Sequence, residues 1–338
     1  MIFNFKKSLV PFDTWTYFYE TVNQSAPITC SNCKPNATQQ ECFVLLSFFF
    51  DFKEGAIKYS SDNIKVLHSE CNFNNNTNTN YGGSVYFYCN SSFVQNKICS
   101  LSSQTTATNW EGGHHSYSEC KYANNLNFVY ESTFYLCGNE IAQKTLSLYY
   151  GNISIRSTNI SKCIGMYNSG YGLHPTKEAS ISYCTIDNTT CNDMALGHYN
   201  LLTNFVSFSN ILNNKISSSF GIIHCYGDIT IENCSINGNE GPPGFKLFSS
   251  ASGSFTVKNC FVQRTGNIRN DITTQNITYE ENKLNLSHFS TSNCEERIYI
   301  VNDVEEKIVN DEESITLLDE YSKLISSLVI PFLTPNKS

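Results

Sequence analysis

The sequence predicts an all-β fold, a right-handed parallel β-helix of about eight or nine coils followed by a short C-terminal helix. Three observations predict this fold. Five segments of the chain share one apolar pattern and recur at intervals of about 25 residues, as the coils of a solenoid do. The apolar residues are mostly β-branched or aromatic, which favours strands. Asn and Ser are abundant, which favours many turns.

The five segments explain how one coil is built. In each segment two apolar positions alternate with polar ones, so they share one face of a strand. The alternation is then interrupted by one extra residue, as a corner between two strands requires. A small residue follows, and two positions later comes another inward-facing apolar residue. Coils stacked about 4.8 Å apart would place equivalent residues in columns inside the rod. The segments begin at Ile153, Ala179, Asn204, Ile229 and Phe255, and their small residues are Thr158, Cys184, Ser209, Cys234 and Cys260.

The earlier coils fit the pattern less cleanly. We assign three of them to Val66–Phe73, Phe87–Val94 and His115–Tyr122, and expect a further coil around Phe128–Tyr150 without a fixed register. Asparagines four residues after the small position are expected to adopt a left-handed turn conformation and to hydrogen-bond along the stack as an Asn ladder. These are Asn75, Asn96, Asn124, Asn188 and Asn213.

Short motifs carry a family resemblance. Phe93-Val94-Gln95-Asn96 and Phe73-Asn74-Asn75-Asn76 resemble the FxxN element of polymorphic outer-membrane protein repeats, and Gly82-Gly83-Ser84-Val85 resembles their GGA(I/L/V) element. Such repeats also occur in protist cell-surface β-helix proteins. The resemblance covers about residues 40–265. It implies a β-helix of the pectin-lyase type and a surface-exposed, adhesin-like role in binding a glycan or a protein, at the cell surface or outside the cell.

The two ends of the chain differ from the repeats. Open ends of a β-helix expose unpaired strand edges, so we expect caps. We assign an N-terminal cap to residues 1–50, the β-helix to residues 51–290, and an acidic C-terminal cap to residues 291–338. Apolar residues at helical spacing predict one amphipathic helix at about 312–329. The alternative is that this helix binds a partner; its polar face is not basic, which disfavours a membrane surface.

Composition limits the partners. The formal net charge is −8, with 22 Lys and Arg against 30 Asp and Glu. Nucleic-acid binding needs clustered cations, so we expect no nucleic-acid partner. The apolar runs are too short to cross a bilayer, and residues 1–10 lack the apolar core of a signal peptide, so we expect no transmembrane segment or secretory signal.

Polysaccharide lyases and hydrolases often use this fold, so an enzyme is the main alternative. Such sites need clustered or paired carboxylates. Asp187 and Asp228, the two aspartates within the repeats, fall at different coil positions. We therefore expect a non-enzymatic binding solenoid. A carbohydrate-active enzyme with a divergent site and a truncated inactive paralogue stay as alternatives. Clustered carboxylates on one face would favour the enzyme, and an exposed aromatic strip would favour binding.

The cysteines and histidines predict no catalytic, cofactor-binding or metal-binding residue, and no cofactor. Cys30-Ser31-Asn32-Cys33 has no second ligand pair, so a local disulfide or free thiols fit better than zinc. The small-position column Cys184, Cys234 and Cys260 is expected to be buried rather than redox-active.

The histidines have structural explanations too. We expect His174 and His224 at equivalent coil positions with Tyr199 between them, as a stacked aromatic column rather than a metal site. His114 and His115 should face opposite sides of a strand and cannot act together.

Overall fold

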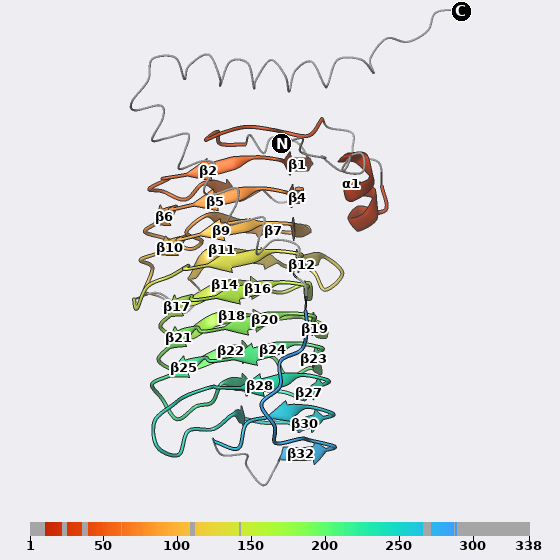
Figure 1. The fold of residues 1–338 in the computed structure, drawn as a ribbon. Coiled ribbons are helices and arrows are strands. Elements are labelled where there is room, and N and C mark those ends of the chain that lie inside the picture. The colour runs from red at the N-terminus through yellow and green to blue at the C-terminus, as the bar shows by residue number, and fades with distance from the viewer. Residues whose placement is uncertain are drawn as a thin grey trace, which may run out of the picture. The chain divides into compact units, whose positions relative to one another are not determined.

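In this computed structural model the chain is a parallel β-solenoid, which confirms the predicted fold class (Figure 1). The structure describes residues 11–21, 26–35, 40–61, 63–108, 112–141, 143–265, 272–286 and 288, all within one compact unit, residues 1–291. The right-handed winding stays a prediction. The predicted acidic cap at 291–338 and its helix at 312–329 lie outside the described residues.

Three long parallel sheets follow the axis of the stack, counting strands in the described ranges only. Sheet A has ten strands: β1 (Glu41–Leu45), β4 (Lys65–Ser69), β8 (Phe93–Asn96), β12 (Leu126–Tyr130), β15 (Asn152–Arg156), β19 (Ala179–Ser182), β23 (Asn204–Ser207), β27 (Ile229–Glu232), β30 (Phe255–Lys258) and β32 (Ile272–Gln275). Sheet B has nine: β2 (Phe48–Phe50), β5 (Asn72–Asn74), β9 (Cys99–Leu101), β13 (Thr133–Tyr135), β16 (Asn159–Ser161), β20 (Thr185–Asp187), β24 (Asn210–Leu212), β28 (Ser235–Asn237) and β31 (Phe261–Val262).

Sheet C closes each coil. Its eight described strands are β3 (Ile57–Tyr59), β7 (Val85–Cys89), β11 (Gly113–Cys120), β14 (Lys144–Tyr149), β18 (Asn168–His174), β22 (Met194–His198), β26 (Ile223–Cys225) and β29 (Phe248–Ser250). Two small sheets extend the turns between sheets B and C: β6 (Thr77–Asn78) with β10 (Gln104–Thr105), and β17 (Ile164–Gly165) with β21 (Thr190–Cys191) and β25 (Lys215–Ile216).

The register of the five regular coils is confirmed. In sheet A, Ile153 pairs with Ala179, and the column continues through Asn204, Ile229 and Phe255. The apolar columns of all three sheets meet in one core cluster, which runs from Cys42 to Ile272. Because each coil buries its apolar residues only against its neighbours, the core is a continuous column rather than a single centre.

The assignment of two earlier coils is wrong. Val66 pairs with Phe93 rather than with Phe87, and Phe93 pairs with Asn127 rather than with His115. The segments beginning at Phe87 and His115 start in β7 and β11 of sheet C, and Phe93 and Val94 at the end of the first segment already belong to β8 of sheet A. Inward and outward residues alternate in every sheet, so alternation alone does not identify the sheet. The coil from Phe93 to Asn127 is 34 residues long and breaks the period. The further coil around Phe128–Tyr150 is confirmed as β12, β13 and β14.

The corner between sheets A and B explains the small-residue column. The residue before each small residue has a left-handed backbone, with φ between 46° and 57° in eight coils, at Leu46, Glu70, Glu131, Ser157, Tyr183, Phe208, Asn233 and Asn259. Lys97 has the same conformation, but Ile98 stands at the small position of its coil. The small residue then donates its hydroxyl or thiol to the carbonyl two residues earlier. These distances are 3.0 Å for Thr158 to Arg156, 3.2 Å for Cys184 to Ser182 and 2.8 Å for Ser209 to Ser207.

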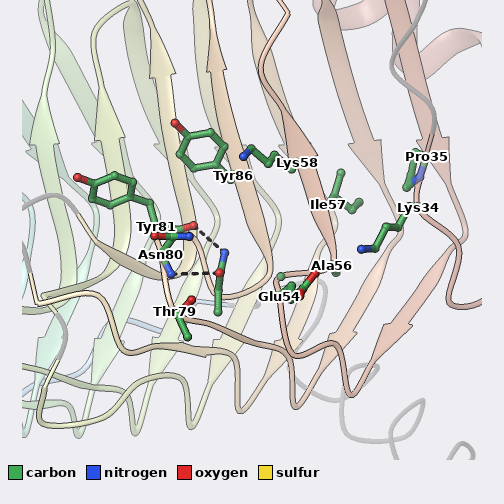
Figure 2. Close-up of a pocket in the computed structure, with 12 residues that line it drawn as sticks. Lys34, Pro35, Glu54, Ala56, Ile57, Lys58, Thr79, Asn80, Tyr81 and Tyr86 are labelled. Carbon is green, nitrogen blue, oxygen red and sulfur yellow. Dashed lines mark hydrogen bonds between the residues drawn. The ribbon is translucent and has the colours of Figure 1, made fainter.

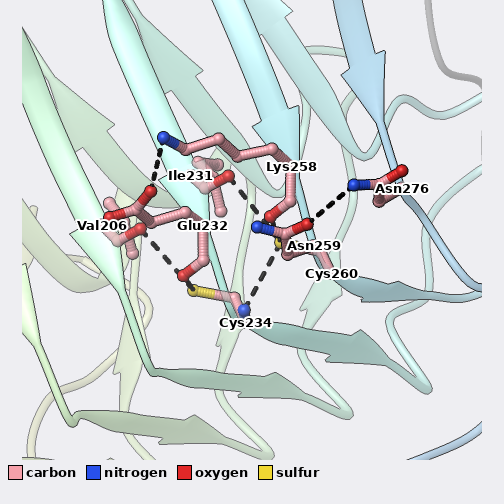
Figure 3. Close-up of polar contacts among 8 residues, drawn as sticks. All are labelled: Val206, Ile231, Glu232, Cys234, Lys258, Asn259, Cys260 and Asn276. Atoms are coloured by element: carbon pink, nitrogen blue, oxygen red, sulfur yellow. Dashed lines mark hydrogen bonds and ion pairs between the residues drawn. The ribbon is translucent and has the colours of Figure 1, made fainter.

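Neighbouring small residues also interact along the column. The Cys234 backbone N–H donates to the Cys260 sulfur at 3.4 Å (Figure 3). The Cys184 N–H donates to the Ser209 hydroxyl at 3.1 Å. Thr, Cys and Ser share this column because each is small and carries one donor that satisfies a corner carbonyl.

The predicted asparagine column holds only in part. Asn75, Asn188 and Asn213 have the expected positive φ at the corner that ends sheet B. Asn96 and Asn124 do not, because they belonged to the wrongly assigned coils. The side chains of Asn75 and Asn213 donate to Asp51 and Asp187, not to other asparagines. One residue later the side chain faces inward, and there the Asn214 amide donates to Asn239 at 3.1 Å.

The stacked strands begin at Glu41, inside the segment assigned to the N-terminal cap. Before them, Ile28 and Ser31 form single bridges to Val44 and Phe48. Helix α1 (Pro11–Tyr19) packs against the outer face of sheet A instead of extending the stack (Figure 1). Its buried side chains Trp15, Phe18 and Tyr19 contact Phe43, Leu45, Leu67 and Val94.

Candidate functional site

The three outer faces of the solenoid differ in what covers them. Helix α1 covers the first strands of sheet A. On sheet B, residues 282–286 and His288 lie against the later strands. There Leu284 and Asn210 exchange two hydrogen bonds of 2.9 and 3.0 Å, and the Asn237 amide donates to the Asn282 carbonyl at 3.0 Å. The outer face of sheet C carries most of the stacked aromatic residues, which makes it the candidate binding face.

One aromatic ring per coil forms a ladder on sheet C. We define the sheet C ladder as Tyr86, Tyr117, Tyr149, His174, Tyr199 and Tyr226. The centroid distances between successive rings are 5.5, 5.3, 4.2, 4.7 and 5.9 Å. The stacking of His174 with Tyr199 confirms the predicted aromatic column. The predicted place of His224 in it is wrong, because His224 pairs in register with Gly197, two residues before the ladder ring Tyr199.

The geometry of the ladder limits what it can bind. His174 is nearly parallel to Tyr149 and Tyr199, with interplanar angles of 8° and 15°. Both faces of this ring are therefore occupied by its neighbours, and its edge points outward. A sugar ring binds an aromatic side chain through the ring face, so the middle of the ladder offers no stacking platform. A platform can form only where the ladder ends.

A buried lysine holds the middle of the ladder together. The Lys144 ammonium lies 5.1 and 5.0 Å from the ring centroids of Tyr149 and Tyr199, and it donates to the Tyr149 hydroxyl at 3.2 Å. Gly172 makes room for it, because a Cβ there would lie 2.5 Å from the Lys144 Cδ. Burial, helped by the Lys144 charge, lowers the pKa of His174 to about 3, so His174 is neutral at pH 7.

The N-terminal end of the ladder opens into a pocket of about 580 Å³ (Figure 2). The pocket lies between the segment Lys34-Pro35 and strand β3. Tyr86 is the first ring of the ladder, and Tyr81 stands beside it, 5.0 Å from Tyr117. The residues around the pocket come from three successive turns of the chain: Lys34, Pro35, Glu54, Gly55, Ala56, Ile57, Lys58, Asn78, Thr79, Asn80, Tyr81 and Tyr86.

Local hydrogen bonds fix the loop that carries Tyr81. The Asn78 side chain donates to the carbonyls of Tyr81 and Gly82, each at 3.1 Å, and accepts the Asn80 N–H at 3.1 Å. Gly82 has φ +70°, and a Cβ there would lie 2.0 Å from the Val85 carbonyl oxygen. The Gly82-Gly83-Ser84-Val85 motif therefore shapes one wall of the pocket. This motif is visible in the sequence, but no pattern near it in the chain points to a binding site.

His114 and His115, which were predicted to face opposite sides of a strand, contact different groups. The His114 Nδ1 is 3.2 Å from the Thr105 N–H. His115 lies in the core, where its ring accepts from Ser100 at 2.8 Å and donates to Gln95 at 2.9 Å. This Ser-His-Gln arrangement is fully buried, and burial lowers the pKa of His115 to about 3. It satisfies buried polar groups and has no access to a substrate.

The remaining candidates have local partners. Cys30 and Cys33 form a disulfide, one of the two outcomes expected for this pair. Cys184, Cys234 and Cys260 are buried, as expected, and burial raises the pKa of Cys184 to about 12.

The two aspartates lie in different corners of the coil. Asp187 accepts from Asn213 at 2.9 Å, and Asp228 accepts from the Ser254 N–H at 2.7 Å. Neither carboxylate has the other as a neighbour that could complete a catalytic pair.

Within the described ranges, no three or more His, Cys, Asp or Glu side chains gather closely enough to hold a metal ion. A helix with the length and apolar character needed to cross a bilayer does not occur in the described part of the chain. No protein-family model, no curated protein and no solved structure matches this sequence.

Proposed function

We propose that this protein is a non-enzymatic, surface-exposed binding solenoid of adhesin-like character that holds a glycan in the pocket at the end of the sheet C ladder. The observation that carries the proposal is the composition of this pocket. Two tyrosine rings stand beside amide, hydroxyl and charged side chains in one concavity. Sugars are bound by this combination, because their C–H faces need an aromatic surface and their hydroxyls need directed polar partners.

A glycan fits the site better than a protein partner does. The pocket has the volume of a small-molecule site, and it is concave, whereas a stable protein interface needs about 800 Å² on each partner. The rings at the end of the ladder also restrict the ligand. Tyr81 and Tyr86 are both half-buried and both stack on Tyr117, at centroid distances of 5.0 and 5.5 Å, so a sugar contacts only the parts of these two rings that border the pocket.

The carboxylates around this face support binding over catalysis. Glu54 is the one carboxylate among the described residues that line the pocket, whereas glycoside hydrolysis uses two carboxyl groups about 5–10 Å apart. On the ladder itself, Glu119 accepts a hydrogen bond from the Tyr117 hydroxyl at 2.8 Å and is engaged there. A divergent carbohydrate-active enzyme is therefore the weaker candidate.

A glycan array probed with the labelled protein tests the proposal. The matched pair of variants is Tyr81→Ala, in the pocket, and Tyr183→Ala, an exposed tyrosine that stacks on Phe208 outside it. We expect Tyr81→Ala to abolish the array signal and Tyr183→Ala to preserve it. If no glycan on the array binds the protein, the proposal is wrong. That result would favour the alternative of a truncated inactive paralogue. Cleavage of a polyuronate by the same sample would instead favour the enzyme.

A further inference from the structure

We infer that the ligand of this pocket is an anionic saccharide, one that carries a carboxylate or a sulfate group. The inference rests on the proposed function and names the chemical class of its ligand. It starts from the charges around the pocket, which are two lysines, Lys34 and Lys58, and one glutamate, Glu54 (Figure 2). The pocket is thus locally cationic, although the whole chain carries a net charge of −8.

No carboxylate of the described residues forms an ion pair with either lysine. Elsewhere on the described solenoid, three lysines pair with a glutamate of an adjacent coil: Lys97 with Glu70, Lys215 with Glu240 and Lys258 with Glu232. Within the described residues neither Lys34 nor Lys58 has such a partner within 4 Å, even though Glu54 lines the same pocket. Their ammonium groups therefore keep their hydrogen-bonding capacity for a ligand.

Lys58 is also held in place. Its ammonium lies 5.5 Å from the centroid of the Tyr86 ring, and the opposite side of that ring stacks on Tyr117. A cation resting on an aromatic face loses little further freedom when an anion binds it. This arrangement gives the ladder a second role, because the stack of rings fixes the position of the charge at its end.

The same contact decides how the ligand lies. Lys58 occupies the face of Tyr86 that looks into the pocket, so a sugar cannot stack there without displacing it. The sugar ring instead contacts the side of Tyr81 that borders the pocket, and its anionic group lies between Lys34 and Lys58. Glu54 then accepts a hydrogen bond from a sugar hydroxyl, which explains why a carboxylate is tolerated in a site for an anion.

Titration calorimetry with three trisaccharides of matched length tests this inference: one carboxylated, one sulfated and one neutral. We expect the carboxylated or the sulfated sugar to bind at least tenfold more tightly than the neutral one, with the tighter of the two identifying the anion. Binding should weaken as the salt concentration rises.

The variants Lys34→Gln and Lys58→Gln should each weaken anionic binding by about tenfold or more, because each removes a charge-assisted hydrogen bond. Lys121→Gln is the matched control, since the Lys121 ammonium also lies over a tyrosine ring, 4.6 Å from the centroid of Tyr88, but outside the pocket. Its affinity should stay unchanged.

The two proposals fail in different ways. If the neutral sugar binds as tightly as the anionic ones and Lys58→Gln has no effect, the inference of an anion is wrong while glycan binding stands. An equal loss in Lys121→Gln and Lys58→Gln would also overturn it, because the attraction would then be a general surface effect. If none of the sugars binds, the proposed function itself fails.

Discussion

The imidazole ring of His174 stacks on the phenol ring of Tyr149 at a centroid distance of 4.2 Å and an interplanar angle of 8°. The two residues are register partners in adjacent strands of sheet C. Their contact shows how residues one coil apart in the sequence become stacked neighbours on the outer face of sheet C. Each coil places one ring above the last, and the ladder then positions the pocket at its end.

The ladder makes a prediction about His174. Replacing His174 with Ala should lower the free energy of unfolding by about 1–3 kcal/mol, because two aromatic contacts are lost. His174→Tyr should retain most of the stability, since the neighbouring coils carry tyrosine at the same position. Urea unfolding of the two variants measures the difference. Equal destabilisation by Ala and Tyr would contradict a stabilising role for stacking.

The buried His115 predicts how stability depends on pH. Its pKa is about 3 in the folded state, lowered by burial, and about 6.5 when the chain is unfolded. Below pH 6.5 the unfolded state therefore takes up a proton that the folded state does not, so stability falls as the pH drops toward 3. At pH 5 the loss from this histidine is about 2 kcal/mol. Above pH 7 His115 is neutral in both states, so it does not change the free energy of unfolding as the pH rises further.

The variant His115→Gln isolates this effect. It is expected to be less stable at pH 7, because Ser100 and Gln95 lose their partner. Its stability should nevertheless fall less steeply between pH 6 and pH 4, by about one proton in the linkage slope. Thermal unfolding across this pH range measures the slope. A slope identical to that of the unmodified protein would show that His115 is protonated in the folded state.

The left-handed corners predict stabilising substitutions. Leu136 has φ +52° at the same corner position where Asn188 and Asn213 stand in later coils, and 46% of its surface is exposed. Leu136→Asn should raise the free energy of unfolding by up to about 1 kcal/mol, because Asn tolerates this conformation. Leu136→Val should lower it by a similar amount. Denaturant midpoints of the pair test this, and a more stable Val variant would refute the explanation.

The small-residue column predicts that the donor matters more than the volume. Cys184→Ser keeps the donor to the Ser182 carbonyl and should change stability by less than about 1 kcal/mol. Cys184→Val fills the space but leaves that carbonyl without its donor, and should cost about 1–3 kcal/mol. Ser209→Cys is the reverse control and should be nearly neutral. The idea is wrong if Val is tolerated as well as Ser.

The repeating part of the molecule could be predicted from the sequence. From Ile153 to Val262 the columns lie where the pattern placed them, because each coil has the same local chemistry and nearly the same length. Between Phe87 and Tyr122 the assignment failed. A strand of sheet C alternates inward and outward residues just as a strand of sheet A does, so a change in coil length removes the information that tells the sheets apart.

The sequence by itself determined the coil: its period, its inward columns, its corners and the ring column that includes His174. These features repeat along the chain, so neighbouring residues specify them. Only the tertiary structure decided that the ladder ends in a pocket. Lys34, Glu54, Lys58, Tyr81 and Tyr86 come from successive turns of the chain and meet only when those turns stack. The physical reason is that the alternation of apolar and polar residues in a strand indicates which face of the sheet each side chain lies on. A pocket depends instead on the distance between the loops of successive coils, which that alternation does not specify.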